Sequence, residues 1–128
     1  MPMPAMFLKA NPYADNVLTL PVKDIDVASS WYGENFAMTE RSRASDPAQQ
    51  VILERDGIQM GFAVNDGKPE EEGAAIEVDD IESLKSEFEA RGVDVGNWRI
   101  DERDGKRFQV FFVVAPDGLC YYFYQGID

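Results

Sequence analysis

The chain has 128 residues, 24 of them acidic and 12 basic, so its formal net charge at neutral pH is −12. It has no histidine and a single cysteine, Cys120, which excludes histidine-dependent nucleophilic triads, histidine metal sites and internal disulfides. The length predicts one domain. The excess of carboxylates disfavours nucleic acid and anionic membranes as partners and leaves cationic ligands open.

Residues 1–14 are expected to form an N-terminal arm that precedes the folded domain. The segment MPMPAMFLKANPYA lacks the basic start of a signal peptide, and prolines interrupt its apolar residues. No stretch of the chain reaches the roughly 18 apolar residues of a membrane span. These features predict a cytoplasmic protein whose residues 15–128 form one domain.

The first half of the domain is expected to contain a strand, a helix and a hairpin, in that order. NVLTLPV (16–22) is rich in β-favouring residues and alternates, which predicts a strand. Residues 24–36 begin with Asp24, a favourable N-cap, and repeat apolar residues at helical spacing. A short strand is expected at 38–44, followed by a loop and by a hairpin of VILER and IQMGFAV with a type I′ turn at Asp56-Gly57.

The same order of elements recurs in the second half. AAIEV (74–78) predicts a strand, and residues 80–91 predict a helix that ends at Gly92. A short strand is expected near 97–101, followed by a charged loop, DERDGKR. FQVFFVVA and LCYYFYQ, joined by Pro116-Asp117-Gly118, are then expected to form a second hairpin.

Matching residues make this repeat specific. Val22-Lys23-Asp24-Ile25-Asp26 corresponds to Val78-Asp79-Asp80-Ile81-Glu82, 56 residues later, and Gly57 corresponds to Gly118, 61 residues later. The second copy therefore carries about five extra residues before its hairpin. The repeat predicts an α+β fold of two tandem βαβββ modules, at about 15–66 and 73–126.

These modules resemble the vicinal oxygen chelate superfamily, which holds glyoxalase I, extradiol dioxygenases, and fosfomycin- and bleomycin-resistance proteins. A V-x-D-I/L-D junction between strand and helix and a closing P-D-G-x-x-Φ-x-F strand carry the resemblance over about residues 15–125. VLTLPVKDIDVASSWYGENFAM, AAIEVDDIESLKSEFE and FFVVAPDGLCYYF look most like the small, acidic bleomycin-resistance proteins. The resemblance implies a curved mixed sheet around a ligand cleft and a homodimer.

The resemblance also implies where a metal would be held. Metal-dependent members place ligands five residues before the junction valine and four residues after the hairpin glycine of each module. Here those positions hold Val17, Gly61, Gly73 and Tyr122. None is a usual ligand for a divalent metal, and a tyrosine ligand needs others to anchor the ion. No metal or cofactor is therefore expected, as in the branch whose members sequester a ligand without turning it over.

Strand alternation divides the side chains into two faces. An almost wholly apolar face should pack beneath the helices; it holds Leu18, Leu20, Val22, Met60, Phe62, Val64, Ala74, Ile76, Val78, Tyr121 and Phe123. The other face mixes small, polar and aromatic groups, which suits a ligand cleft. It holds Val17, Thr19, Pro21, Gln59, Gly61, Ala63, Gly73, Ala75, Glu77, Cys120, Tyr122 and Tyr124.

Two further expectations concern three phenylalanines of one strand and the single cysteine. Phe108, Phe111 and Phe112 lie on a strand so apolar that both of its faces must be covered, and the pattern does not decide which face each occupies. Cys120 has no basic neighbour in the sequence, so it is expected to pack rather than to act as a nucleophile.

Six side chains are candidate ligand contacts: Thr19, Gln59, Glu77, Trp98, Tyr122 and Tyr124. The two tyrosines offer flat stacking surfaces, or else packing in a dimer interface. Thr19 and Gln59 can hydrogen-bond a polar ligand or face water. Glu77 can pair with a cationic group or remain an exposed carboxylate. Trp98 can close over the cleft or anchor an interface.

Three functions are compatible with these features. The first is a metal-free homodimer that sequesters a flat cationic or polar small molecule, for which bleomycin-type glycopeptides are the family's precedent. The second is a member of the superfamily without a drug-binding role, whose cleft its own side chains fill. The third is a metal-free lyase or isomerase that uses Tyr122, Tyr124 or Glu77 for proton transfer. A metalloenzyme ranks last, because the four metal positions hold no suitable ligands.

Overall fold

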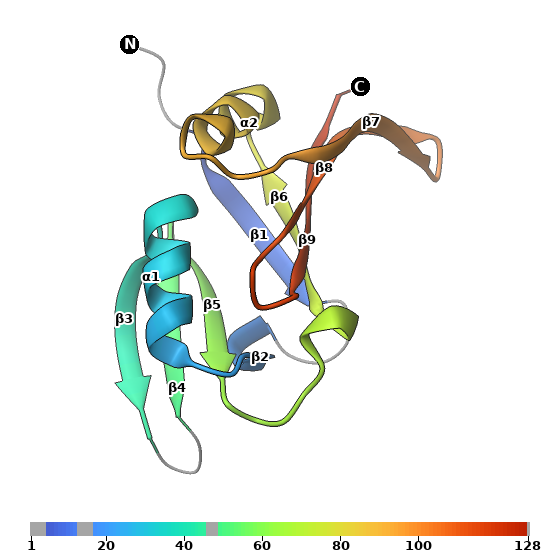
Figure 1. Cartoon of the computed structure of the whole chain (residues 1–128). Helices are drawn as coiled ribbons and strands as arrows, with labels where there is room; N and C mark the ends of the chain where they lie inside the picture. Colours follow the sequence, from blue (N-terminus) through green and yellow to red (C-terminus); the bar gives the residue numbers. More distant parts are fainter. Residues whose placement is uncertain (1–4, 13–16, 46–48, 128) are drawn as a thin grey trace.

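The computed structural model describes residues 5–12, 17–45 and 49–127. Within these ranges the chain forms two helices and two sheets, which lie side by side in Figure 1. The four-stranded sheet has the order β2-β5-β4-β3, and the five-stranded sheet has the order β1-β6-β9-β8-β7. The helix α1 packs on the first sheet and α2 packs on the second. The predicted α+β fold class is confirmed.

The two halves of the chain repeat one strand order, which confirms the pair of βαβββ modules. In each module the first strand pairs parallel with the last, and the remaining neighbours pair antiparallel. The first module has β2 (Leu20–Pro21), β3 (Thr39–Ala44), β4 (Gln50–Arg55) and β5 (Ile58–Ala63). The second has β6 (Gly73–Val78), β7 (Gly96–Arg103), β8 (Lys106–Val114) and β9 (Cys120–Gly126).

Both helices begin at the aspartate of the repeated junction motif. The Asp24 carboxylate accepts hydrogen bonds from the Asp26 and Val27 N–H groups at the start of α1 (Ile25–Asn35). Asp80 accepts from the Ser83 N–H at the start of α2 (Ile81–Ala90). Free N–H groups at a helix start need such acceptors, which explains why the aspartate recurs. Gly92, with φ of 82°, follows the end of α2 as expected.

Two Asp-Gly turns shape the hairpins. Asp56 and Gly57 have φ of 55° and 81°, as the predicted turn between β4 and β5 requires. Asp104 and Gly105 have almost the same values, 53° and 76°. They join β7 to β8 within the segment expected to be a charged loop, so both strands are longer than predicted. Figure 1 shows this hairpin projecting from the body of the molecule.

The strand expected at 16–22 is mostly absent. The described part of this segment forms a 3-10 turn, η1 (Val17–Thr19), and the two-residue strand β2. Gly61 on β5 explains the difference, since a Cβ there would lie 2.0 Å from the Leu18 carbonyl oxygen. The turn can cross β5 this closely only because residue 61 has no side chain. Asn16 lies outside the described residues.

Part of the expected N-terminal arm belongs to a sheet. Residues Phe7–Pro12 form β1, which pairs antiparallel with β6. Phe7 is 1% exposed, and the Met6 N–H donates to the Asp79 carboxylate at 2.6 Å. The arm interpretation is therefore wrong for this strand, because β6 offers a free edge and Phe7 fills a gap in the core. Residues 1–4 and 13–14 lie outside the described part.

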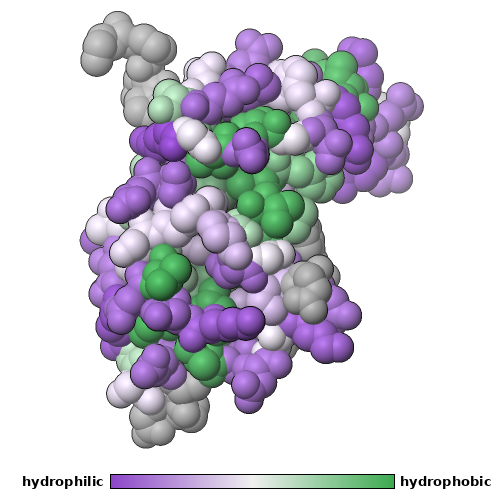
Figure 2. Space-filling view, viewed as in Figure 1, coloured by the Kyte–Doolittle hydropathy of each residue, from purple (hydrophilic) through white to green (hydrophobic). Residues whose placement is uncertain are grey.

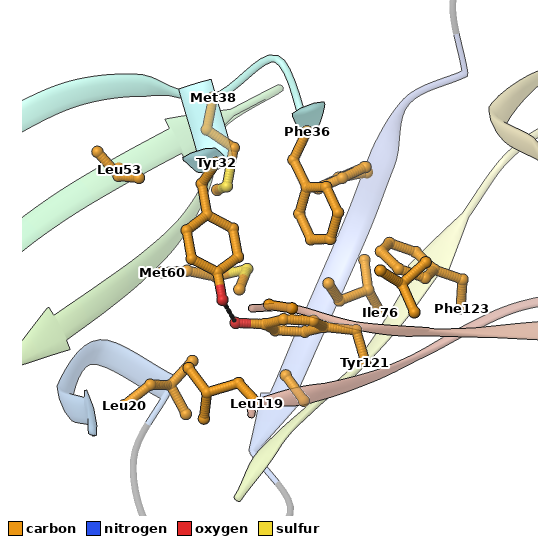
Figure 3. Close-up of a cluster of buried hydrophobic side chains, with 14 of the residues drawn as sticks. Leu20, Tyr32, Phe36, Met38, Leu53, Met60, Ile76, Leu119, Tyr121 and Phe123 are labelled. Atoms are coloured by element: carbon orange, nitrogen blue, oxygen red, sulfur yellow. Dashed lines mark hydrogen bonds between the residues drawn. The ribbon is translucent and has the colours of Figure 1, made fainter. Parts of the chain in front are cut away.

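The two modules share one core. Figure 3 shows side chains of α1 and β5 meeting those of β6 and β9. The Tyr32 hydroxyl lies 2.6 Å from that of Tyr121, and the Phe36 ring stacks on Phe88 of α2 with centroids 4.9 Å apart. The apolar face predicted for β5, β6 and β9 lies in this core, with Met60, Phe62, Ala74, Ile76, Val78, Tyr121 and Phe123 at most 1% exposed.

Candidate functional site

Four aromatic rings lie together on one face of β8 and β9, the face opposite the shared core. The ring centroids of Tyr122 and Tyr124 are 5.8 Å apart and tilted by 31°. Phe112 contacts Tyr122 edge-on at 5.0 Å, and Phe108 contacts Tyr124 edge-on at 5.8 Å. This arrangement follows from strand register, because Phe112 lies opposite Tyr122 in the pairing of β8 with β9. We call this set of four the aromatic face.

The structure shows which face of β8 each of the three phenylalanines occupies. Phe108 and Phe112 are half-buried on the aromatic face. Phe111 is fully buried on the core side, where its ring stacks on Phe123 at 5.0 Å. The core side of β8 is therefore covered as expected, whereas the side of Phe108 and Phe112 is only partly covered and opens toward solvent.

Arg103, at the end of β7, lies over the aromatic face. Its guanidinium carbon is 5.1 Å from the Phe108 ring centroid, 5.4 Å from Tyr122 and 5.9 Å from Tyr124. A cation within about 6 Å of a ring face is attracted by the ring quadrupole. One long hydrogen bond of 3.4 Å also joins its Nη2 to the Tyr122 hydroxyl.

A second charged pair borders the face beside Tyr122. The Tyr122 hydroxyl donates to Asp101 at 2.7 Å, and Arg99 Nε donates to the same carboxylate at 2.8 Å. Hydrogen bonds from Arg99 and Tyr122 lower the pKa of Asp101. Burial, and then the hydrogen bond to Asp101, raise the pKa of Tyr122 to about 12. At neutral pH the tyrosine therefore keeps its proton and the aspartate remains charged.

The aromatic face opens into two adjoining hollows. One, of about 500 Å³, is lined by Asn11, Ala75, Arg103, Asp104, Lys106, Phe108 and Tyr124. The other, of about 380 Å³, is lined by Ala75, Asp101, Arg103, Phe112 and Tyr122. Burial and the charge of Glu77 raise the pKa of Tyr124. Glu77 therefore lies close enough to act on this tyrosine, to which it is also paired in register.

The structure brings three of the six predicted contacts together and separates the others. Tyr122 and Tyr124 line the hollows on the second sheet, and Glu77 lies beside Tyr124 in the pairing of β6 with β9. Thr19 lies on η1, where its carbonyl oxygen accepts from Asn65 at 2.9 Å. Gln59 is exposed on β5 and donates to Glu54 at 3.4 Å. These last two residues belong to the other module and line neither hollow.

Trp98 lies on the opposite side of the second sheet from the aromatic face. Its ring is 6.3 Å from that of Phe111, and Lys85 of α2 lies over it at 5.5 Å. The interpretation of Trp98 as a lid over the cleft is therefore wrong in this structure. A bulge between Gly96 and Arg99 shifts the register of β7, and Asn97 has a φ of 56°. Trp98 is 40% exposed, which leaves the alternative of an interface anchor.

The donor set does not fit a metal ion of the superfamily type. Val17, Gly61 and Gly73 have no ligating atom in their side chains, and the Tyr122 hydroxyl is used by Asp101. The place of a side chain at residue 61 is taken by the Leu18 backbone. Among the residues that the structure describes, no group of three or more acidic, cysteine or histidine side chains is placed to hold a metal.

Sequence reasoning missed Arg103, Asp101, Arg99, Phe108 and Phe112 as parts of this site. The alternation of Arg99, Asp101 and Arg103 was a usable signal, because residues two apart share a strand face. The charged segment DERDGKR hid it, since such a run is more typical of a loop. An Asp-Gly pair inside that run was the second signal, because it favours a hairpin turn.

Another hollow, of about 230 Å³, lies beside α1 and is lined mainly by apolar groups, among them Val27, Trp31 and Pro116. In the view of Figure 2, hydrophobic residues gather over α1 and in the middle of the molecule, and hydrophilic residues cover the outer parts. Val27 is 63% exposed. This hollow has fewer converging polar groups than the aromatic face, so we place the candidate site at the latter.

In the part of the chain that the structure describes, neither helix has the length and apolar character needed to span a membrane.

Comparison with known proteins establishes similarity through structure alone. The sequence matches no protein-family model and no curated protein. TnmS3, an antibiotic binding protein from Streptomyces sp. CB03234, superposes with a TM-score of 0.69 at 17% identity, over 90% of this chain and 98% of that one. A glyoxalase/bleomycin resistance protein/dioxygenase from Alicyclobacillus acidocaldarius gives 0.68 at 20% identity, over 87% and 89%.

A third solved structure extends the range of these neighbours. The fosfomycin resistance protein FosX from Listeria monocytogenes gives a TM-score of 0.65 at 15% identity, over 90% of this chain and 93% of that one. The matches span nearly the whole of each chain, and both βαβββ modules are present here in the expected order. The chain therefore has the same fold as these solved structures, that of the glyoxalase/bleomycin resistance/dioxygenase protein.

Proposed function

We propose that this chain is a metal-free binding protein that holds a flat, cationic or polar small molecule against Tyr122 and Tyr124. The observation that carries the proposal is the aromatic face itself. Four rings converge on one strand surface that opens into hollows, with charged groups at their borders. Aromatic surfaces of this kind favour stacked, planar ligands, and the few polar groups around them would fix the ligand's orientation.

The polar groups favour binding over proton transfer. With the pKa of Tyr122 raised to about 12, its hydroxyl is a hydrogen-bond donor at neutral pH and a poor base. The pKa of Tyr124 is raised as well. A lyase or isomerase that uses these tyrosines as bases is therefore the weaker proposal.

The structural neighbours supply a precedent for ligand capture on this fold. One of them is described as an antibiotic binding protein and another as a fosfomycin resistance protein. Their identities to this chain, 17% and 15%, support the fold and leave the ligand open. Bleomycin-type glycopeptides, which are planar at one end and cationic, are the first ligands to test.

The test is a calorimetric titration of bleomycin into the wild-type protein, Tyr122→Ala and Tyr122→Phe. We expect about one ligand per protomer, weaker binding at high salt, and roughly tenfold weaker binding to Tyr122→Ala because a stacking ring is lost. Tyr122→Phe keeps the ring and loses the hydroxyl's bonds to Asp101 and Arg103, so it should bind nearly as the wild type does.

Circular dichroism of each variant separates binding from folding. If Tyr122→Ala unfolds, the ring belongs to the core and the site is placed wrongly. If Tyr122→Ala is folded and binds as tightly as the wild type, the stacking proposal fails. If the wild type takes up no bleomycin, a glycopeptide role is contradicted, and a member of the superfamily with another ligand or none becomes the better proposal.

The proposal includes a homodimer in the cytoplasm. The hollows are open toward solvent, and Trp98 and Ile100 on the edge strand β7 are 40% and 53% exposed. Exposed large apolar groups on an edge strand are suited to a contact between copies. Sedimentation velocity should give twice the monomer mass of 14.4 kDa, and Trp98→Ser should shift the protein toward monomer. A wild type that sediments as a monomer at high micromolar concentration would contradict the dimer.

A further inference from the structure

We propose that Arg103 occupies the cationic subsite of the aromatic face, so that the ligand is a planar cation that takes the place of this side chain. The inference rests on the proposed function. It adds that the ligand is positively charged and that Arg103 limits the affinity of the protein for it. In this view the free protein carries its own substitute for the ligand's cationic group.

The contacts of Arg103 are those expected of a bound cation. Its guanidinium lies over three rings at 5.1–5.9 Å, and a flat guanidinium resembles the planar cationic end of a small molecule. Two acidic groups flank the position. Glu77 and Arg103 both act on the Tyr124 hydroxyl, and Arg103 also acts on Asp101.

The side chain is nevertheless weakly held. Arg103 is exposed, its one hydrogen bond measures 3.4 Å, and no carboxylate of the described residues lies within the 4.0 Å of an ion pair with it. Arg99, two residues earlier on the same face, is tied to Asp101 at 2.8 Å. Cation–π contacts at exposed sites contribute only about 0.5–1 kcal/mol each. A ligand that offers a better-seated cation can therefore displace Arg103.

Displacement would leave a subsite that still attracts positive charge. Asp101 keeps its partner Arg99, which also lies over Phe112, whereas the rings of Phe108, Tyr122 and Tyr124 lose their cation. Glu77 still acts on Tyr124. The chain as a whole carries a net charge of −12, which favours the approach of cations. A planar anion would have the opposite requirement, because it would bind the guanidinium of Arg103 and lose affinity without it.

The internal cation should lower the apparent affinity for an external one. If the face is free only part of the time, the apparent dissociation constant rises by the inverse of that fraction. Removal of Arg103 should therefore tighten cation binding, on the order of tenfold for contacts with three rings. It should loosen the binding of a planar anion.

Lys106 offers a matched control for simple charge. It lines the same hollow and carries the same charge, but among the described residues it makes no cation–π contact with the four rings. If net charge alone governed binding, Lys106→Ala and Arg103→Ala would tighten cation binding equally. If Arg103 blocks the subsite, Arg103→Ala will tighten cation binding more than Lys106→Ala does.

The experiment titrates the full chain, Arg103→Ala and Lys106→Ala with proflavine, a planar cation, and with 9-anthracenecarboxylate, a planar anion, by fluorescence. We expect proflavine to bind Arg103→Ala about tenfold more tightly than the wild type and Lys106→Ala with little change. Equal proflavine affinity in Arg103→Ala and the wild type would overturn the inference and leave the proposed function standing. Preference of the wild type for the anion, lost in Arg103→Ala, would also overturn it.

One further outcome would contradict both the inference and the proposed function, and an NMR measurement tests the inference alone. If none of the three proteins binds either probe, the aromatic face takes no planar ligand and the proposed function fails together with the inference. An NMR readout tests the displacement directly, since ring currents should shift the Arg103 side-chain signals in the free protein. Saturating proflavine should return them toward random-coil positions; unchanged signals at saturation would contradict the displacement.

Discussion

Arg55 and Arg103 both contact aromatic rings, and the structure holds these two arginines in opposite ways. Arg55 is 8% exposed, and its guanidinium carbon lies 4.6 Å from the Phe7 ring. It donates to the Phe36 and Ala5 carbonyl oxygens at 2.9 and 2.8 Å, and to both oxygens of Glu87 at 2.7 and 2.9 Å. Arg103 contacts three rings, is exposed, and has one long hydrogen bond.

The difference teaches how to separate a structural cation from a displaceable one. A buried guanidinium is costly unless its N–H groups are hydrogen-bonded. The acceptors of Arg55 are Ala5, which precedes β1, Phe36, which caps the end of α1, and Glu87 of α2. It therefore joins the two modules and the N-terminal strand. The ring contacts of Arg103 occur without that set of acceptors, so they are free to be exchanged for a ligand's.

Arg55→Ala should have the largest effect on stability. The change removes one of the two arginines that bind the partly buried Glu87 carboxylate, and it removes the donor to two carbonyl groups. This should cost about 3 kcal/mol in the free energy of unfolding. Urea unfolding followed by circular dichroism measures the loss. Arg103→Ala is the matched control and should lower the free energy of unfolding by about 1.5 kcal/mol, the total expected of three exposed cation–π contacts. Equal losses in the two variants would remove the distinction between them.

The pH dependence of stability provides a second test of the pair between Arg55 and Glu87, with a smaller expected effect on the free energy of unfolding. Burial alone would raise the pKa of Glu87, but hydrogen bonds from Arg55 and Arg91 outweigh it and place this pKa below its ordinary value of 4.5. The unfolded chain therefore holds the Glu87 proton more tightly than the folded chain. The stabilisation is complete above about pH 4.5 and is lost as the pH falls through the folded pKa.

Urea midpoints at about pH 6 and pH 3 provide the measurement. The wild type should lose more stability on acidification than Glu87→Gln, which has no carboxylate to protonate at this position. Asp101→Asn serves as the control, because the pKa of Asp101 is lowered too but its carboxylate is exposed to solvent screening. An acid response of Glu87→Gln as steep as that of the wild type would show that the Arg55 pair contributes little.

Local patterns predicted a large part of the fold. The repeated aspartate junctions at Asp24 and Asp80, the type I′ turn at Asp56-Gly57 and the alternation on β5, β6 and β9 each depend on residues close in the chain. Tyr122 and Tyr124 were placed together for the same reason, since they lie two apart on one strand. Pairing across strands was not accessible in this way.

The parts of the site that sequence reasoning missed depend on register or on a distant approach. Phe112 reaches Tyr122 only through the pairing of β8 with β9, and Arg103 reaches both tyrosines only because the Asp104-Gly105 turn folds β7 back beside β8. Trp98 directly precedes Arg99 on β7, so it lies on the face opposite Arg99, Asp101 and Arg103, against Phe111.

The sequence by itself determined two βαβββ modules, their helix starts, their core-facing strand residues and the lack of metal ligands at the superfamily positions. Those features follow from spacing and side-chain chemistry within short segments. Only the tertiary structure decided that β1 completes the second sheet, that the Leu18 backbone fills the space beside Gly61, and that Arg103 covers the aromatic face. Each of these joins residues far apart in the chain or on separate strands, so packing and strand register decided them.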